Sequence, residues 1–204
     1  MLVKTDPTTT PAHKGMSVIL VEAGTPGFEI LKVEHKMGSR GYETASFTLD
    51  DVRLPADHLL GGEEFYQSRA GFKASMATFN MTRPLHTAQG VGMGRAAHDF
   101  ALDFVKAEYP KHSRRRQLAL ERLARIRRGL HTARLMYLQA VWLAKTGQSN
   151  ALEASYAKMY SPPVVLEAVV AALHALVRAC PDARVGAAVV LAAAVRDSLP
   201  PFAL

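Results

Sequence analysis

The spacing of apolar residues changes once along this chain, and that change constrains the fold more than any other feature. Ala45, Phe47 and Leu49 alternate with polar neighbours, which is the period of two expected of a β-strand. From Gln67 onward the apolar residues recur at spacings of three and four, as on one face of a helix. The sequence therefore predicts an α+β fold, with an antiparallel β part followed by an antiparallel helical bundle.

The β part is predicted to contain short strands separated by turns. Strands are expected over 16–22, 28–33 and 44–49, with a loop rich in proline and threonine over 5–14. Pro55 ends this region, because proline has no N–H to donate to a strand partner. The alternation in the last strand predicts a sheet with one packed face and one wetter face.

Three helices are predicted, over 67–108, 115–145 and 150–177. Pro84 is expected to kink the first helix or to begin a new first turn, and Pro162 with Pro163 to interrupt the third. Leu123, Ile126, Leu130, Ala133, Tyr137 and Val141 form the predicted packing stripe of the second helix. Gly147 is its predicted stop, and Asn150 with Glu153 predicts a capped start for the third.

The positive charge of the chain is concentrated in one segment. The net charge is +7, and residues 106–128 carry nine basic and two acidic residues, so the rest of the chain is balanced. This segment could be a solvated helix face, a site for the phosphates of a nucleotide cofactor or of CoA, or a nucleic-acid surface. No aromatic residues interleave with its arginines for base stacking, so we expect no nucleic-acid partner.

Composition excludes several other classes. Hydrophobic residues make up 49% of the chain, which is enough for a buried core. Cys180 is the only cysteine, so no internal disulfide is possible. The apolar run over 185–195 is too short to span a bilayer, and no signal segment opens the chain. The histidines show no paired metal-ligand spacing. We expect a cytoplasmic protein with no membrane partner and no metal.

Three glycines fall close together over 90–94 and suggest a dinucleotide-binding loop. They follow a helical pattern rather than a strand, and the third glycine of that motif is missing at the required spacing. We therefore expect these glycines to allow close packing of helices.

Several phrases, in order and at the right spacing, resemble the acyl-CoA dehydrogenase family from residue 1 to about 160. They occupy residues 15–22 and 25–28, 36–41 and 43–44, 50–55 and 59–61, 82–84 and 88–92, 133–135 and 140–142, and 154–158. The resemblance implies a partial middle β-domain over 1–62 and an incomplete C-terminal helical domain over 63–178. Residues 179–204 match no family phrase, and are either a divergent terminal helix or the product of a shifted reading frame.

The resemblance also implies a reaction. In this family a glutamate removes the α-proton of a fatty acyl-CoA thioester while the β-hydrogen leaves as hydride to FAD. Members assemble through their C-terminal helices, so a homo- or hetero-oligomer is expected, using the apolar faces of 118–142 and 164–177. FAD and a fatty acyl-CoA are therefore the expected cofactor and substrate.

Substrate-binding residues are implied at the stretch Asn80, Met81, Thr82 and Arg83, which in many members contacts the CoA part of the substrate. The family usually has an aspartate at the first of these positions, so Asn80 removes a charge. Arg83 is the strongest candidate. The alternative is a buried arginine paired with a helix carboxylate.

Cofactor-binding residues are implied at the start of the second helix. Gln117 stands where the family places a glutamine that reaches the FAD adenosine of a neighbouring subunit, and the alternative is an exposed helix glutamine. The arginine and Phe-Gly that precede this glutamine in the family are missing. Arg116, or its neighbours Arg114 and Arg115, could take the place of that arginine.

No catalytic base is identified in the sequence. Thr82 stands where some branches of the family place the glutamate, and the Glu-Gly-Thr loop that carries it in other branches is not found. Glu153 and Glu167 are expected in surface or capping roles. We therefore expect a truncated family member that is inactive alone. The alternatives are a non-catalytic assembly subunit of a heteromeric acyl-CoA dehydrogenase, and a degenerate gene product with no stable fold.

Overall fold

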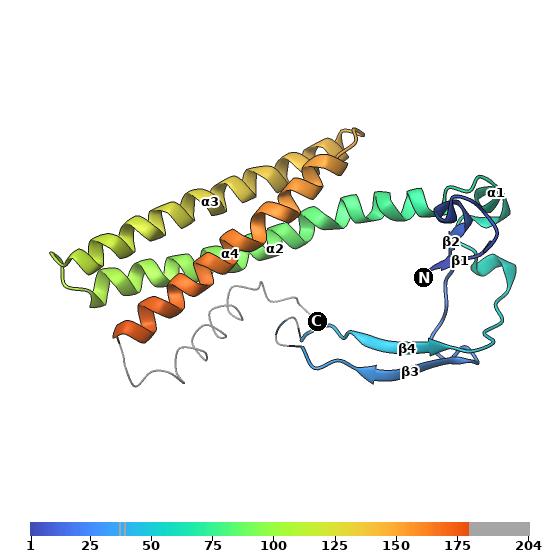
Figure 1. Cartoon of the computed structure of the whole chain (residues 1–204), viewed down its shortest axis with the longest axis horizontal. Coiled ribbons are helices and arrows are strands. Elements are labelled where there is room, and N and C mark those ends of the chain that lie inside the picture. Colours follow the sequence, from blue (N-terminus) through green and yellow to red (C-terminus); the bar gives the residue numbers. More distant parts are fainter. Residues whose placement is uncertain (37, 39, 180–204) are drawn as a thin grey trace. The chain divides into compact units, whose positions relative to one another are not determined.

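The computed structural model describes residues 1–36, 38 and 40–179, with side chains through Ala175. The chain divides into two compact units, Met1–Ala77 and Thr78–Leu204 (Figure 1). The first holds two small antiparallel sheets and the second a helical bundle, which confirms the α+β prediction. Met37 and Ser39 of the family-like phrase over 36–41, and all predictions for 180–204 including Cys180, lie outside the described residues.

The first unit is built from two separate β-ribbons. Strand β1 (Leu2–Lys4) pairs antiparallel with β2 (Met16–Val18), and β3 (Phe28–Val33) pairs antiparallel with β4 (Ala45–Leu49). Between and after them lie the 3-10 helices η1 (Ala12–Gly15) and η2 (Ala56–His58) and the short helix α1 (Gly62–Gln67). The strands predicted over 28–33 and 44–49 are confirmed to within a residue, whereas the first predicted strand stops four residues early.

The predicted packed face of the β3–β4 ribbon is not formed. Phe47 and Leu49 are 45% and 38% exposed, and Ile30 on the partner strand is 56% exposed. The rings of Phe28 and Phe47 lie 5.5 Å apart between centroids, and Phe47 remains exposed. The prediction was wrong because alternation reveals which face is apolar, whereas burial also requires another layer of structure to cover it.

Asp6 organises the turn between β1 and β2. Its carboxylate accepts hydrogen bonds from the Thr9 hydroxyl and from both the hydroxyl and the backbone N–H of Thr8, and Arg69 lies 3.3 Å away. These donors, with Thr9 the largest contributor, hold the pKa of Asp6 well below its usual value. The turn is therefore stabilised by the ionised form of this side chain.

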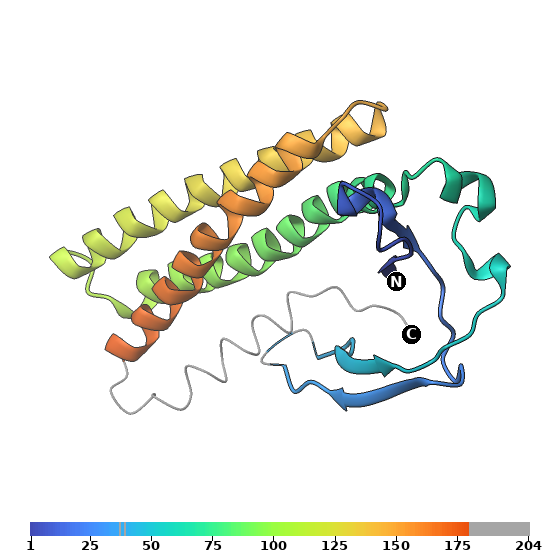
Figure 2. The same cartoon turned by 45° about the vertical axis from the view of Figure 1, so that its right-hand side comes forward.

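Three long helices form the second unit. Helix α2 (Gly71–Glu108), which starts in the first unit, is followed by α3 (Arg114–Lys145) and α4 (Ala151–Ala179). The short connection between α2 and α3 makes them antiparallel, and α4 crosses both (Figures 1 and 2). The predicted C-terminal end of α2 and both ends of α3 are confirmed within about a residue, whereas α2 begins at Gly71, four residues later than predicted. Gly147 adopts the left-handed conformation expected after a helix, with φ 76°.

The prediction that Pro162 and Pro163 would interrupt the third helix was wrong, since α4 runs through both, and α2 runs on through Pro84 rather than beginning a new first turn there. A proline inside a helix leaves the carbonyl four residues earlier without its N–H donor. For Pro84 that carbonyl belongs to Asn80, and the side-chain amide of Asn150 donates to it at 3.0 Å. The missing hydrogen bond is thus replaced by a residue from another part of the bundle.

Small residues bring the three helices close together. The buried cluster joins the three helices through Ala97, Ala101 and Val105 of α2, Leu123, Ile126 and Leu130 of α3, and Ala168, Ala171, Ala172 and Ala175 of α4. A methyl group on Gly94 would lie 2.7 Å from Leu130 Cδ2, and one on Gly129 would lie 2.9 Å from Val164 Cγ1. The expected packing role of the glycines over 90–94 is confirmed at Gly94, whereas Gly92 has open space around it.

Candidate functional site

Arg83 and Asn80 are brought together on α2, three residues apart on one side of the helix. The Arg83 guanidinium donates to the Asn80 side-chain oxygen at 2.6 Å, in a partly buried position. No carboxylate lies within ion-pair distance of Arg83 in the described part of the chain. The alternative, in which Arg83 is paired with a helix carboxylate, is therefore not found. A neutral amide orients the guanidinium and leaves its positive charge available to a ligand.

The other two residues of the predicted substrate stretch lie differently. Met81 is 56% exposed and points away from Arg83, since residues two apart on a helix face nearly opposite sides. The Thr82 hydroxyl donates to the Phe79 carbonyl at 3.3 Å, within the same helix. The four residues are therefore divided, with Asn80 and Arg83 forming the polar pair.

Asn150 is a residue of this region that the sequence analysis did not assign correctly. It was expected only to cap α4, but its buried side-chain amide donates to the carbonyls of both Asn80 and Ala140, at 3.0 and 3.1 Å. It thereby ties α2 to the end of α3 at the place where α4 begins, and fixes the backbone beside Arg83. The sequence signal that could have found it is Pro84, whose lack of an N–H requires a donor from elsewhere.

The predicted cofactor residues lie at the first turn of α3. Ser113 caps this helix by accepting from the Arg116 backbone N–H at 3.2 Å, and the Arg116 guanidinium donates to the Tyr109 carbonyl at 3.3 Å. Gln117 is exposed, and its amide donates to Glu121 one turn later at 3.0 Å. Most of the N–H groups of Arg116 and the carbonyl oxygen of Gln117 remain free for a polar ligand.

The two predicted groups lie at opposite ends of the bundle. Arg83 is about 25 residues from the end of α2, and α3 returns antiparallel from Arg114, so at 1.5 Å per residue Arg83 and Gln117 are about 35 Å apart. The hydrogen bond from Asn150 agrees with this, because it places Asn80 beside Ala140, near the far end of α3. One copy of this bundle does not bring the two groups into one site.

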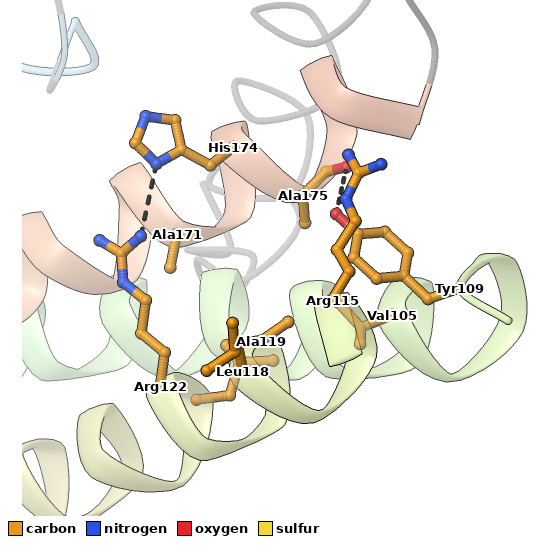
Figure 3. Close-up of a pocket in the computed structure, with 10 residues that line it drawn as sticks. Val105, Tyr109, Arg115, Leu118, Ala119, Arg122, Ala171, His174 and Ala175 are labelled. Atoms are coloured by element: carbon orange, nitrogen blue, oxygen red, sulfur yellow. Dashed lines mark hydrogen bonds between the residues drawn. The ribbon is translucent and has the colours of Figure 1, made fainter. Parts of the chain in front are cut away.

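A pocket of about 180 Å³ opens near the end of α2 and the start of α3 (Figure 3). Its apolar lining comes from all three helices and consists of Val105, Leu118, Ala119, Leu123, Ala171 and Ala175. Tyr109 is held by a 3.4 Å hydrogen bond from its hydroxyl to the Ala175 carbonyl, and the Arg115 guanidinium lies 4.9 Å from its ring centroid. The pocket thus combines an apolar floor with an arginine over an aromatic ring.

The opposite rim of this pocket carries Arg122 and His174, whose Nη1 and Nδ1 atoms are 3.4 Å apart. Because arginine only donates, His174 accepts through Nδ1. Glu167 lies 3.7 Å from the Arg122 side chain and 2.5 Å from that of Arg125, so the charge on this rim is partly neutralised. Glu167 is thus engaged in ion pairs, as its expected surface role requires. Of the residues that line this pocket, sequence analysis named only Arg115 as a site residue, a possible substitute for the family arginine.

No group of three or more histidine, cysteine or acidic side chains in the part of the chain that the structure describes is arranged to hold a metal ion. No helix among the described residues is long and apolar enough to cross a membrane.

Comparison with known proteins identifies the bundle. A family model for the C-terminal domain of acyl-CoA dehydrogenase matches residues 69–178, which is more than half of the chain. The chain belongs to the acyl-CoA dehydrogenase family. The resemblance stated from the sequence is therefore confirmed.

Individual relatives agree with the family. A cyclohexane-1-carbonyl-CoA dehydrogenase from Syntrophus aciditrophicus is 35% identical over 153 residues, covering 72% of this chain and 38% of that protein. An acryloyl-CoA reductase (NADH) from Anaerotignum propionicum is 46% identical over 92 residues, covering 45% of this chain and 22% of that protein. The structure of butyryl-CoA dehydrogenase from Megasphaera elsdenii aligns with a TM-score of 0.74 and 26% identity, covering 86% of this chain and 44% of that one. The chain spans about two fifths or less of the length of these two curated relatives.

Proposed function

We propose that this chain is part of a flavoprotein that removes the α- and β-hydrogens of a fatty acyl-CoA thioester, with FAD as the hydride acceptor. Family membership supports the reaction class, and the names of the compared relatives all specify a CoA thioester. The observation that carries the proposal is the separation of about 35 Å between Arg83 and Gln117. The CoA part of the substrate and the adenosine part of FAD are therefore expected at opposite ends of the bundle.

In this proposal Arg83 binds the CoA part of the substrate. Its guanidinium is held by the neutral amide of Asn80, so its charge is free to meet a phosphate or a carbonyl of the ligand. Asn150 maintains the backbone geometry of this turn through its bond to the Asn80 carbonyl. These residues bind and orient the thioester and take no part in proton transfer.

The residues at the start of α3 fit the adenosine and phosphate end of FAD. Arg116 offers free N–H donors to phosphate oxygens, and Gln117 offers both a donor and an acceptor on an exposed surface. The apolar pocket with Arg115 over Tyr109 lies near the same end of the bundle, and its shape and charge suit a flat ring that carries phosphates. When bound, FAD supplies the acceptor for the β-hydrogen. Because Arg83 is far away, we infer that the FAD held here serves a neighbouring copy.

We also propose that residues 1–204 do not catalyse the reaction alone. Of the two glutamates considered from the sequence, Glu167 is engaged with Arg122 and Arg125. Glu153 lies in the first turn of α4, where a negative charge favours the helix N-terminus. Neither has a position that marks it as the base. The protein is proposed to act in the cytoplasm.

A second candidate function, as a non-catalytic assembly subunit, is favoured by the exposed apolar side chains of α3 and α4. Those that are 43–71% exposed on these helices include Leu135, Leu138, Val141, Trp142, Leu152, Tyr156, Met159 and Leu166. Exposed apolar side chains in this number are typical of a surface that binds another protein. Under this hypothesis the partner brings the catalytic base.

Ligand titration of the full chain and two variants tests the proposal. Arg83→Ala is expected to weaken binding of a CoA thioester by about tenfold or more while leaving FAD binding within twofold, since one charged hydrogen bond is lost. Gln117→Ala is expected to weaken FAD binding and to leave the CoA thioester unaffected. If both variants weaken both ligands equally, the two groups belong to one site and the proposal is wrong.

A further inference from the structure

A second cationic pocket lies between α2 and α3, among residues that the proposed function does not use. On α2 it is lined by Arg95, His98 and Asp99, at spacings of three and four that place them on one side of the helix. On α3 it is lined by Arg127, Leu130, His131 and Arg134, which recur in the same way. Because the helices are antiparallel neighbours, the two polar stripes flank a surface pocket of about 180 Å³, in which the three arginines are exposed and His98 and Leu130 are buried.

The charges around this pocket are unbalanced. Its lining contains three arginines and two histidines but a single carboxylate, Asp99. Asp99 Oδ1 is 2.9 Å from His98 Nδ1, so that carboxylate is engaged with the histidine. Among the described residues, no acidic group lies within ion-pair distance of Arg95, Arg127 or Arg134. Arg122 and Arg125 on the same helix differ, because both lie within ion-pair distance of Glu167.

His98 forms a buried polar part of the pocket lining. It is only 2% exposed, and it lies on α2 between the core residues Ala97 and Ala101. Burying an imidazole in a helix interface is unfavourable unless its nitrogens have partners. Asp99 provides a partner for Nδ1 and fixes the ring, and the buried Leu130 forms an apolar side of the cavity.

We propose that this pocket binds a phosphate group, held by the guanidinium groups of Arg95, Arg127 and Arg134. Guanidinium donors match the geometry of phosphate oxygens, and three of them without carboxylate partners favour an anion of more than one charge. The cavity has the volume of about six liquid waters, which leaves room for one phosphate group and some water. The proposal is independent of the proposed function, because none of its residues belongs to the sites assigned to CoA or FAD.

Calorimetric titration of the full chain with inorganic phosphate at physiological salt tests this proposal. Arg127→Ala and Arg134→Ala are each expected to weaken phosphate binding by about tenfold, the effect of losing one charged hydrogen bond. Arg128→Ala is the matched control, since it removes the same charge from the next position of α3 but does not line the pocket. It is expected to change the affinity by less than about twofold, through long-range charge alone.

The source of the phosphate is distinguished by titrating adenosine monophosphate beside inorganic phosphate. If both bind equally and respond equally to Arg127→Ala, the site recognises the phosphate alone. Tighter binding of the nucleotide, with the same response to the variant, would identify a nucleotide-borne phosphate. The proposal is overturned if Arg128→Ala weakens binding as much as Arg127→Ala does, or if phosphate at about 10 mM gives no binding heat. All three arginines tested are exposed, so the variants are expected to fold, and their melting temperatures check this.

Discussion

Replacing Asn150 by alanine is expected to destabilise the bundle, by an amount that depends on the proline at position 84. The Asn150 amide donates to the Asn80 carbonyl, which has no helix donor because Pro84 lacks an N–H. It also donates to the Ala140 carbonyl. Leaving the first carbonyl unsatisfied costs about 1–2 kcal/mol and losing the second hydrogen bond about 1 kcal/mol, so Asn150→Ala is expected to cost about 2–3 kcal/mol.

The dependence on Pro84 makes this prediction specific. In a Pro84→Ala background, the alanine N–H at position 84 can donate to the Asn80 carbonyl as in an ordinary helix. Asn150→Ala should then cost only about 1 kcal/mol, which gives a coupling of about 1–2 kcal/mol between the two positions.

Urea denaturation followed by circular dichroism, on the full chain and the three variants, measures that coupling. Gln148→Ala is the control, because Gln148 is exposed in the same connection and its side chain donates to Thr146, whereas its backbone bond to Leu143 is kept in the variant; it is expected to change stability by less than about 0.5 kcal/mol. Equal costs for Asn150→Ala with and without Pro84, within about 0.3 kcal/mol, would refute the reasoning.

Two further predictions concern packing and pH. Gly92→Ala should stabilise the chain by about 0.5–1 kcal/mol through helix propensity alone. Gly94→Ala, two residues away, should be about 1–3 kcal/mol less stable than Gly92→Ala, because its methyl group would lie 2.7 Å from Leu130 Cδ2. Melting temperatures compare them, and a Gly94→Ala variant as stable as Gly92→Ala would contradict the packing. The lowered pKa of Asp6 means that its stabilisation is complete above about pH 4, the usual aspartate pKa, and is lost as the pH falls toward the folded-state pKa. Asp6→Asn should therefore reduce the loss of stability on acidification, and an unchanged acid unfolding profile would show that the turn does not depend on this charge.

The fold was predictable where the signal was local. The end of α3 followed from Gly147, which acts on its own backbone neighbours. The continuity of α2 through Pro84 was not predictable in the same way. It depends on Asn150, which lies 70 residues after Asn80 in the sequence and becomes its neighbour only after the bundle has formed.

The candidate sites show the same division. Arg83 and Asn80 are three residues apart on a helix, so the sequence could pair them. The two cationic pockets combine residues from different helices, and only the register between those helices brings the side chains together. Within the basic segment over 106–128, the sequence also could not distinguish Arg122 and Arg125, which share an ion pair with Glu167, from Arg127, which has no acidic partner among the described residues.

The separation of the two ends of the bundle can be measured directly by pulsed electron paramagnetic resonance. Spin labels at positions 81 and 118 use the exposed side chains of Met81 and Leu118, beside Arg83 and Gln117, in a Cys180→Ser background. The helix rise predicts a narrow distance distribution near 35 Å, in protein diluted so that distances within one chain dominate. A distance below about 20 Å, or a broad distribution without a peak near 35 Å, would contradict the placement of the CoA and FAD residues at opposite ends of one bundle.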